Sequence, residues 1–493
     1  MKKWQDLAPP DDPNSWYDMN GFWPTERGTY ETCDAYGTAD VTATSAGTPV
    51  YAWCANATPS ANYNPEYILD GSKIWQYQTL SGATDRTGTA AYPTLTDSIQ
   101  FIQYGVVTIG CMGATRTGPT GGGLPGADTI YTTGATSNFA VLSGAPRAMC
   151  GCVQSNAVLL FWTENAGGGN IAEDGYAISD VGDYTNWTTG EATSGRLIST
   201  PGGVTAAIPF NNAVYVFKDS GAGDGSIYRL TYVGGVVKWA TELLHQGVGC
   251  KYFKMAAAGK DGILFLGSER TEAGSPTSVF YWFDGVSEPV VANQFTSIPA
   301  NSGTAGEFGI DYDPKRNTFS VWVGNGIVYW FNPATGAWGK YDTGVTDLVP
   351  VIGASGLFAG VAAGSRLTRA WRKSATNTLR LYTASGHASP TYIHTAKYGK
   401  PDRKTNFRRA IPLVRRRVDS GTDSVSLEMT LFREREDTTA QTTRTIAEST
   451  ERKRFDLQGG AATDNFARFK LTYTDIDCEI DDVLIDAKDA GTD

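Results

Sequence analysis

Short apolar runs separated by turns recur along the middle of this chain, and they constrain its fold more than any other feature. No long stretch places apolar residues at helical spacing, whereas Gly, Thr, Tyr and Trp are abundant. In the last run, Gly324-Asn325-Gly326 offers the positive φ angles of a tight hairpin between two strands. These patterns predict an all-β protein. The clearest runs are 157–162, 213–217, 226–232, 262–267, 278–285 and 318–338.

The spacing of these runs favours a β-propeller. A strand that ends in an aromatic residue and then a turn recurs at Phe217, Phe283 and Phe331, at intervals of roughly 50 to 65 residues. Propeller blades of four strands repeat at about 40 to 50 residues, so the intervals fit blades with longer loops. A barrel or a sandwich is the alternative, but about 300 residues of hairpins are too many for one simple sandwich.

Three regions of different composition follow from a pass along the 493 residues. Residues 1–70 are rich in Pro, Asn, Asp and aromatic residues without a sustained period, which predicts an extended arm that packs on the propeller or on a neighbouring subunit. Residues 71–375 carry the propeller pattern. Residues 376–493 predict a C-terminal β-sandwich, because 424–432 and 466–474 alternate between apolar and polar residues and 478–487 can close a small sheet.

The signals of targeting and of catalysis are absent from the sequence. The first 20 residues lack the apolar core of a signal peptide, and no run of about 18 apolar residues predicts a membrane span. Three histidines, His245, His387 and His394, lie in no metal or nucleophile motif, and 121–126 lacks the ending of a phosphate-binding loop. We therefore expect no catalytic residue, no metal, no cofactor and no enzymatic activity. His387 and His394, on either side of 388–393, are expected in a loop or an edge strand.

The cysteines favour reduced thiols. An odd number, seven, is scattered over the chain, which argues against a disulfide framework and for synthesis in a cytoplasm. Cys150 and Cys152 are the one close pair, and without further ligands they indicate no metal site. The seven are Cys33, Cys54, Cys111, Cys150, Cys152, Cys250 and Cys478.

The stretch 178–190, ISDVGDYTNWTTG, is similar in composition to the Asp box of sialidase propellers. Its spacing differs, because Asp180 follows Ser179 directly, and the stretch does not recur. We interpret it as a structural turn that seats Trp187.

The same stretch contributes to a second likeness. AVLLFWTEN at 157–165, the turn at 178–190 and the long segment at 202–232 resemble the tail-hub proteins of short-tailed bacteriophages, also known as tail nozzle or packaged-DNA stabilisation proteins. The ending TDNFARFKLTYTDIDCEIDDVLID at 463–486 is similar to the closing pattern of that family. The order of arm, propeller and sandwich agrees as well.

This resemblance implies a structural protein of the virion tail, made in the cytoplasm of the host bacterium. Several copies, usually six, would form a ring, the nozzle or hub, below the portal-adaptor proteins of the head-tail connector. The ring would close the channel, retain packaged double-stranded DNA without reading its sequence, allow genome ejection and offer attachment surface for tail fibres or spikes. Such a DNA stabilisation role needs no bond-making chemistry.

A basic segment at 397–418 stands out in an acidic chain. The span 366–417 holds 14 Lys or Arg and one acid, so its charge is about +13, whereas the rest of the chain carries about −23 and the total is −10. An unpaired buried charge is costly, so the segment must face water, phosphate or acidic protein. Its candidate partner-docking or phosphate-facing residues are Lys397, Lys400, Arg403, Lys404, Arg408, Arg409, Arg415, Arg416 and Arg417.

Three interpretations of this segment stay open. It could be a solvated edge strand whose charges prevent edge-to-edge aggregation. It could be a surface that docks on acidic residues of a neighbouring copy or of the adaptor. Contact with DNA phosphates is the least favoured, because many phosphate contacts would slow ejection and the segment lacks alternating aromatic residues.

One alternative function belongs to a different class. A carbohydrate-binding or depolymerising propeller on the tail would stack sugars on clustered Trp and Tyr and would cut with paired carboxylates. Against it, Trp282, Trp322 and Trp330 lie inside strand patterns and are expected to pack the blades.

Overall fold

The computed structural model describes residues 99–344 except for 112–128, 134–136, 165–170, 220–224, 271–275, 293–307, 315 and 325, and elsewhere it describes the strands and a few residues beside them. In this part of the chain the secondary structure consists of β-strands and one 3-10 helix, η1 (Phe253–Met255). No helix in the described part is long and apolar enough to cross a membrane. The all-β prediction is confirmed.

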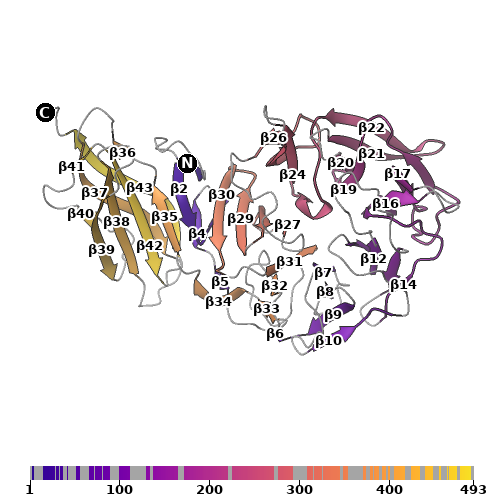
Figure 1. The fold of residues 1–493 in the computed structure, drawn as a ribbon, viewed down its shortest axis with the longest axis horizontal. Coiled ribbons are helices and arrows are strands. Elements are labelled where there is room, and N and C mark those ends of the chain that lie inside the picture. The colour runs from indigo at the N-terminus through magenta and orange to yellow at the C-terminus, as the bar shows by residue number, and fades with distance from the viewer. Residues whose placement is uncertain are drawn as a thin grey trace.

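Six antiparallel units of four strands follow one another along the chain and around the ring in Figure 1; four are separate sheets, and the first and the sixth are parts of larger sheets. Within each unit every strand pairs with the next strand in sequence, which is the arrangement of propeller blades. The predicted β-propeller is therefore confirmed. The strands are β7 (Tyr51–Cys54), β8 (Glu66–Leu69), β9 (Ile74–Thr79), β10 (Gly82–Asp85), β11 (Gln100–Tyr104), β12 (Val107–Cys111), β13 (Ile130–Thr132), β14 (Ala140–Val141), β15 (Cys150–Gln154), β16 (Ala157–Glu164), β17 (Ile171–Ile178), β18 (Thr193–Arg196), β19 (Gly203–Phe210), β20 (Ala213–Asp219), β21 (Ser226–Gly234), β22 (Lys238–Gln246), β23 (Ala256–Ala258), β24 (Ile263–Arg270), β25 (Pro276–Phe283), β26 (Val290–Val291), β27 (Phe308–Asp313), β28 (Thr318–Val323), β29 (Ile327–Asn332) and β30 (Ala337–Asp342).

The predicted hairpin at Gly324 is present between β28 and β29. Gly324 has φ 87° and Gly326 has φ 70°, and the amide of Ile327 donates to the carbonyl of Gly324. These positive φ angles suit glycine, which has no Cβ to clash with the backbone. The other predicted runs likewise coincide with strands β16, β20, β21, β24 and β25.

Strands from both ends of the propeller segment close the ring. After β30 come β31 (Leu348–Gly353), β32 (Ala370–Arg372) and β33 (Thr378–Arg380), and β33 pairs with β6 (Val41–Thr42) from the N-terminal part of the chain. β31 also pairs in parallel with β7 of the first blade. We call β31, β32, β33 and β6 the closure sheet. The chain is thus joined to itself across about 300 residues by backbone hydrogen bonds.

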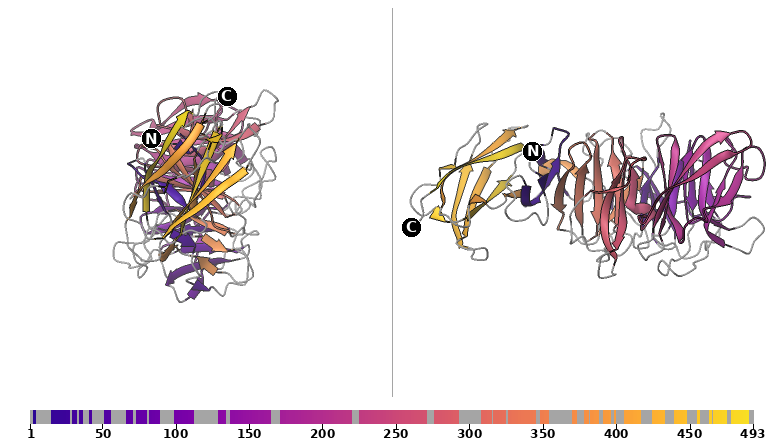
Figure 2. Two further views of the ribbon diagram at one scale, coloured as in Figure 1. Left: turned by 90° about the vertical axis from the view of Figure 1, so that its left-hand side faces the viewer. Right: turned by 90° about the horizontal axis from the view of Figure 1, so that it is seen from above.

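The C-terminal strands belong to two larger sheets, which also contain N-terminal strands. The first has the order β1-β2-β35-β42-β38-β39, and the second continues the sixth blade in the order β30-β3-β4-β43-β37-β40. β36 pairs with β42 and β41 with β37, while β34 pairs with β5. Figure 2 shows these strands extending the molecule beyond the ring. Their bounds are β1 (Lys3–Trp4), β2 (Ser15–Asn20), β3 (Phe22–Pro24), β4 (Tyr30–Thr32), β5 (Asp34–Tyr36), β34 (Tyr382–His387), β35 (Thr391–Thr395), β36 (Tyr398–Gly399), β37 (Thr405–Arg416), β38 (Ser424–Phe432), β39 (Thr439–Ala447), β40 (Phe455–Asp456), β41 (Thr463–Asp464), β42 (Phe466–Thr474) and β43 (Cys478–Asp489).

Strands β38 and β42 coincide with the two predicted alternating runs. On β42, Phe469, Leu471 and Tyr473 are buried, whereas Lys470 and Thr472 between them are partly exposed. This is the one-sided burial that the alternation predicts. His394 lies on β35, which pairs with β2 and β42, so its predicted place in a loop or edge strand is wrong. The packing of the two C-terminal sheets as a sandwich stays a prediction.

The N-terminal strands pack closely on the sixth blade. Phe22 is fully buried and meets Tyr473 of β42 edge to face at 5.5 Å. Trp23 meets Trp330 of β29 in the same way at 5.6 Å. The amide of Gly21 donates to the carbonyl of Lys340, so β3 continues the blade by backbone pairing as well as by packing.

The predicted boundaries at 70 and 375 fall inside sheets. Residue 70 lies between β8 and β9 of the first blade, and residue 375 lies between β32 and β33 of the closure sheet. The aromatic residues named as blade packing fill the core: Trp330 and Trp322 are buried, and Trp282 packs against the largest apolar cluster.

Candidate interaction surfaces

Four of the nine predicted docking residues lie on strand β37: Arg408, Arg409, Arg415 and Arg416. The other five, Lys397, Lys400, Arg403, Lys404 and Arg417, lie outside the described residues. The structure therefore gives the surroundings of the segment through the backbone register of β37.

That register places acidic positions opposite the arginines. Arg409 is paired with Asp486 of β43 on one side and with Asp456 of β40 on the other. Arg415 is paired with Glu479, which is also paired with Glu31 of β4. Residues directly opposite each other in an antiparallel pair share one face of the sheet, and opposite charges there are favourable.

This register bears on two of the three hypotheses for the basic segment, the solvated edge strand and the acidic partners. β37 has neighbours on both sides at Thr405–Asn406 and at Arg409–Ala410, so it is not an edge strand there. The chain itself supplies acidic positions in the neighbouring strands, in addition to those expected on other molecules. Arg408 differs, because it falls at a register shift between Phe407 and Arg409 and has no cross-strand partner in the described register.

The helix η1 makes contacts with several blades. Phe253 packs against three separate apolar clusters, which come from different blades. It meets Tyr51 of β7 edge to face at 6.3 Å, and the ammonium of Lys254 lies 4.4 Å from the centre of the same ring. Burial raises the pKa of Tyr51 far above its usual value, so its phenol stays neutral. Phe253 thus links side chains of blades that are distant in sequence.

The turn at 178–190 is structural, as predicted. The Asp180 carboxylate accepts hydrogen bonds from the amides of Val181 and Glu191 and from the side chain of Asn186. A Cβ at Gly190 would lie 2.4 Å from that carboxylate, so the turn requires glycine there, which also has φ 65°. Trp187 packs against the apolar cluster between the second and third blades.

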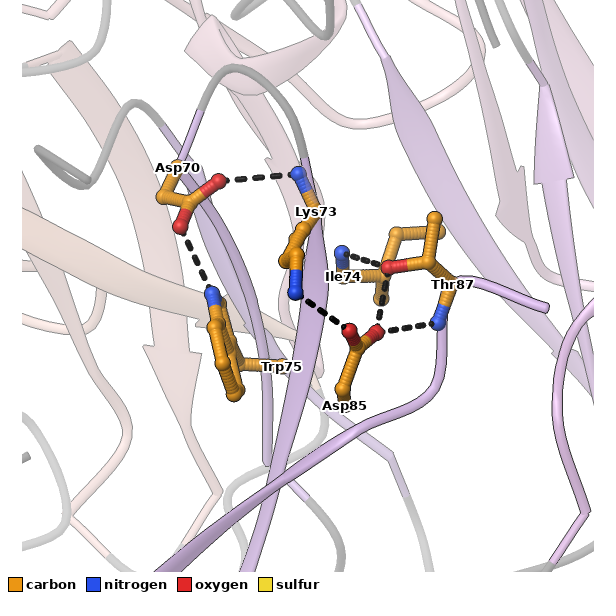
Figure 3. A network of polar contacts seen from close by, with 6 residues as sticks. All are labelled: Asp70, Lys73, Ile74, Trp75, Asp85 and Thr87. Atoms are coloured by element: carbon orange, nitrogen blue, oxygen red, sulfur yellow. Dashed lines mark hydrogen bonds and ion pairs between the residues drawn. The ribbon is translucent and has the colours of Figure 1, made fainter. Parts of the chain in front are cut away.

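A polar network ties the first blade together beside a partly exposed indole (Figure 3). Asp70 accepts from the indole of Trp75 at 2.6 Å and from the amide of Lys73 at 2.8 Å. The ammonium of Lys73 pairs with Asp85 at 2.8 Å, and Asp85 also accepts from the amide and hydroxyl of Thr87. Burial opposes ionisation of Asp85, but these hydrogen bonds and the charge of Lys73 together lower its pKa. A carboxyl of this kind cannot act as the raised-pKa acid that glycoside cleavage needs.

Cys111, Cys150, Cys152 and Cys250 are buried, and none of these four is in a disulfide bond. Burial raises the pKa of the Cys111 and Cys152 thiols well above the usual value, so they are poor nucleophiles. No group of three or more His, Cys, Asp or Glu in the described part of the chain could hold a metal ion. His245 packs edge to face on Phe283 at 5.5 Å.

One surface feature was missed in the sequence. Tyr104 of β11, Tyr131 of β13 and Tyr184 of the turn after β17 form a partly exposed cluster at the seam between the second and third blades. The ring centres of Tyr104 and Tyr184 are 5.4 Å apart, and those of Tyr131 and Tyr184 are 6.0 Å apart. The three positions are far apart in sequence and share no local motif, so only the fold brings them together.

Comparisons with known proteins give no family. No family model matches the chain, and no curated protein matches it. Similar solved structures include a glycoside hydrolase (10% identity, 92% of this chain and 100% of that chain, TM-score 0.27), BamB from Moraxella catarrhalis (11%, 72% and 97%, 0.28) and the extracellular domain of a two-component system protein from B. thetaiotaomicron (8%, 96% and 59%, 0.41). Identities and TM-scores this low support no inference about activity or partners.

Proposed function

We propose that this protein is a structural subunit of a bacteriophage tail, which assembles as a ring of six copies below the portal-adaptor and closes the channel behind packaged DNA. The resemblance at 157–232 and 463–486 suggests this role. In the proposal, the two C-terminal sheets form a sandwich and the N-terminal strands form an arm that braces it against the propeller.

The observation that carries the proposal is the continuous sheet from the sixth blade to the C-terminal strands. Its order, β30-β3-β4-β43-β37, runs from the propeller through the N-terminal strands into the basic strand. β3 is paired with β30 at Phe22 and β4 with β43 at Tyr30 and Glu31, and the contact of Phe22 with Tyr473 adds to this pairing, so we expect the propeller and the C-terminal strands to resist relative rotation. Such stiffness suits a subunit that must hold a ring against the pressure of packaged DNA.

The proposal puts the DNA channel between the subunits and not through a single propeller. In the proposed ring, the channel lies on the symmetry axis of the six copies, and each propeller forms part of its wall. Fibres or spikes would attach to the outer surface.

Nuclease protection tests the closure role directly. Phage particles made without this protein should build and fill heads and then lose the genome, so nuclease-protected DNA per head should fall strongly. Purified protein added to freshly filled heads should restore protection. Full retention of DNA without the protein would contradict channel closure.

The oligomeric state is the second test. Cryo-electron microscopy of the parent virion should place six copies in one ring at the tail. A single copy per particle, together with a monomer in mass photometry in the presence of the adaptor, would contradict the proposal. A monomer before assembly is compatible with it.

The depolymerase alternative receives less support from the described residues. Asp70 and Asp85 flank the indole of Trp75, but both carboxylates already accept hydrogen bonds from neighbouring groups. Release of reducing sugars from host polysaccharide by the purified protein would favour this alternative over a purely structural role.

A further inference from the structure

The seam between the second and third blades carries the cluster of Tyr104, Tyr131 and Tyr184, which we call the tyrosine cluster. The inner sides of these rings pack against a buried apolar group that includes Ile109 and Leu160. Their outer sides remain partly exposed. Packing between blades accounts for the buried sides of the rings. It leaves three aromatic surfaces together in water, where a smaller or more polar residue would expose less apolar surface.

Polar groups border the tyrosine cluster. The hydroxyl of Tyr104 donates to the carbonyl of Asn156 at 3.4 Å, and the amide of Gly182 donates to the same carbonyl at 2.8 Å. Asn156 and Asp183 are exposed. Asp183 is held by the amide and hydroxyl of Thr185, at 2.9 and 2.6 Å, so its carboxylate has a fixed position in the turn. An apolar surface with a few placed polar groups is the usual composition of a ligand site.

The charge beside the rings is negative. Asp183 directly precedes Tyr184 in the turn. Burial and then the charge of Asp183 raise the pKa of Tyr104, and burial, Tyr131 and Asp183 in that order raise the pKa of Tyr184, so both phenols stay neutral. A phosphate or a nucleic acid backbone would be repelled here, whereas a neutral ligand with hydroxyl groups can donate to the carboxylate.

The angles between the rings separate the remaining ligand classes. The plane of Tyr184 is inclined by 50° to that of Tyr104 and by 53° to that of Tyr131. One flat aromatic ligand cannot lie on all three rings. A chain of puckered sugar rings can present an apolar face to each ring in turn while its hydroxyls reach Asn156 and Asp183.

We infer that the tyrosine cluster, with Asn156 and Asp183 at its border, is a binding site for a neutral polysaccharide. This inference concerns recognition without cleavage and does not depend on the tail role. Its test uses purified protein, whereas the closure role is tested on particles, so the two can fail separately.

The experiment measures binding of four neutral hexasaccharides, derived from α-1,4-glucan, β-1,4-glucan, mannan and chitin, to the full chain by calorimetry and saturation-transfer nuclear magnetic resonance. At least one should bind with saturation transfer to its ring protons. Tyr184→Ala and Tyr104→Ala should each weaken binding by about tenfold, whereas Tyr184→Phe should keep it because the ring is retained. Asp183→Asn, which keeps an acceptor for Thr185, should weaken binding severalfold.

A matched control is Tyr232→Ala. Tyr232 is a partly exposed tyrosine on another blade, where it packs on Trp239 at 5.4 Å, and its replacement should leave binding unchanged. Circular dichroism would show that the variants remain folded, and Tyr104→Ala and Asp183→Asn decide the question if Tyr184→Ala does not fold. The inference is overturned if none of the four saccharides binds, if the alanine variants bind as well as wild type, or if heparin or a proline decamer competes for the same tyrosines with higher affinity.

Discussion

At the scale of single residues, Glu31 links the N-terminal strands to the sixth blade. Its carboxylate accepts from the indole of Trp23 at 3.1 Å and from Arg316 at 3.3 Å, and the Arg316 guanidinium lies 3.9 Å above the Trp23 ring. Glu31 is 7% exposed, so its removal leaves a buried indole N–H and a charge without this acceptor. We expect Glu31→Ala to lower the free energy of unfolding by about 2 kcal/mol in chemical denaturation.

The control for that variant is Glu242→Ala. Glu242 pairs with Arg229 across two strands, but both side chains are well exposed, at 55% and 36%. An exposed pair contributes about 0 to 1 kcal/mol because water screens it. Equal losses for the two variants would show that the contacts of Glu31 do not hold the strands together.

Lys218 predicts a pH dependence of the stability of the folded state. Its ammonium is fully buried and donates to the carbonyls of Leu197 and Thr200, and burial lowers its pKa below the usual 10.5. Between the lowered value and 10.5, the unfolded chain binds a proton that the folded chain has lost, so the folded state gains stability as pH rises. Relative to Lys218→Met, the wild-type melting temperature should therefore rise as the pH is raised toward 10.5. A constant difference between the two proteins would contradict the shift, and the comparison cancels other titrating groups.

At the scale of elements, the register of β37 makes the effect of charge reversal specific to position. Arg409→Glu puts a like charge opposite Asp486 and Asp456, and it should destabilise the C-terminal sheets by about 1 kcal/mol or more. Arg408→Glu is the matched control, since Arg408 lies at the register shift. Adding Asp486→Lys and Asp456→Lys to Arg409→Glu should restore stability. Urea unfolding of the single and the combined variants gives the free energies for this mutant cycle. If Arg408→Glu and Arg409→Glu are equivalent, the acidic positions do not balance the arginines.

The same strands show what sequence could and could not predict. β38 and β42 were predictable because alternation is a local property of nine residues, and the hairpin at Gly324 was predictable because a tight turn needs positive φ angles. The acidic partners of Arg409 were not, since a register between strands about 50 to 80 residues apart leaves no local signal. The tyrosine cluster was missed for the same reason: Tyr104, Tyr131 and Tyr184 meet only when two blades pack.

At the scale of the whole molecule, the N-terminal strands are shared by every large part of the structure. β6 completes the closure sheet, β3 and β4 join the sixth blade to β43, and β2 pairs with β35. The predicted separate C-terminal domain therefore depends on strands from the opposite end of the chain. Sequence composition suggested that residues 1–70 must pack on something, but it could not indicate that they enter several sheets.

Deletion of residues 1–44 should consequently weaken the propeller and the C-terminal sheets together. The deletion removes β1 to β6 and the buried side chains of Met19, Phe22, Trp23 and Tyr30, each of which stabilises the fold by about 2 kcal/mol through apolar burial. It also uncovers Tyr473 and opens the closure sheet at β33. The truncated chain should melt at a clearly lower temperature, bind a dye for exposed apolar surface and be cut by protease in both the propeller and the C-terminal strands.

A peptide of residues 1–44 added in trans should reverse these effects, because it supplies the missing strands without a covalent link. A truncated protein that kept the wild-type melting temperature, or that lost only its C-terminal strands to protease, would show that the propeller closes without β6 and that the N-terminal strands brace one end of the molecule alone.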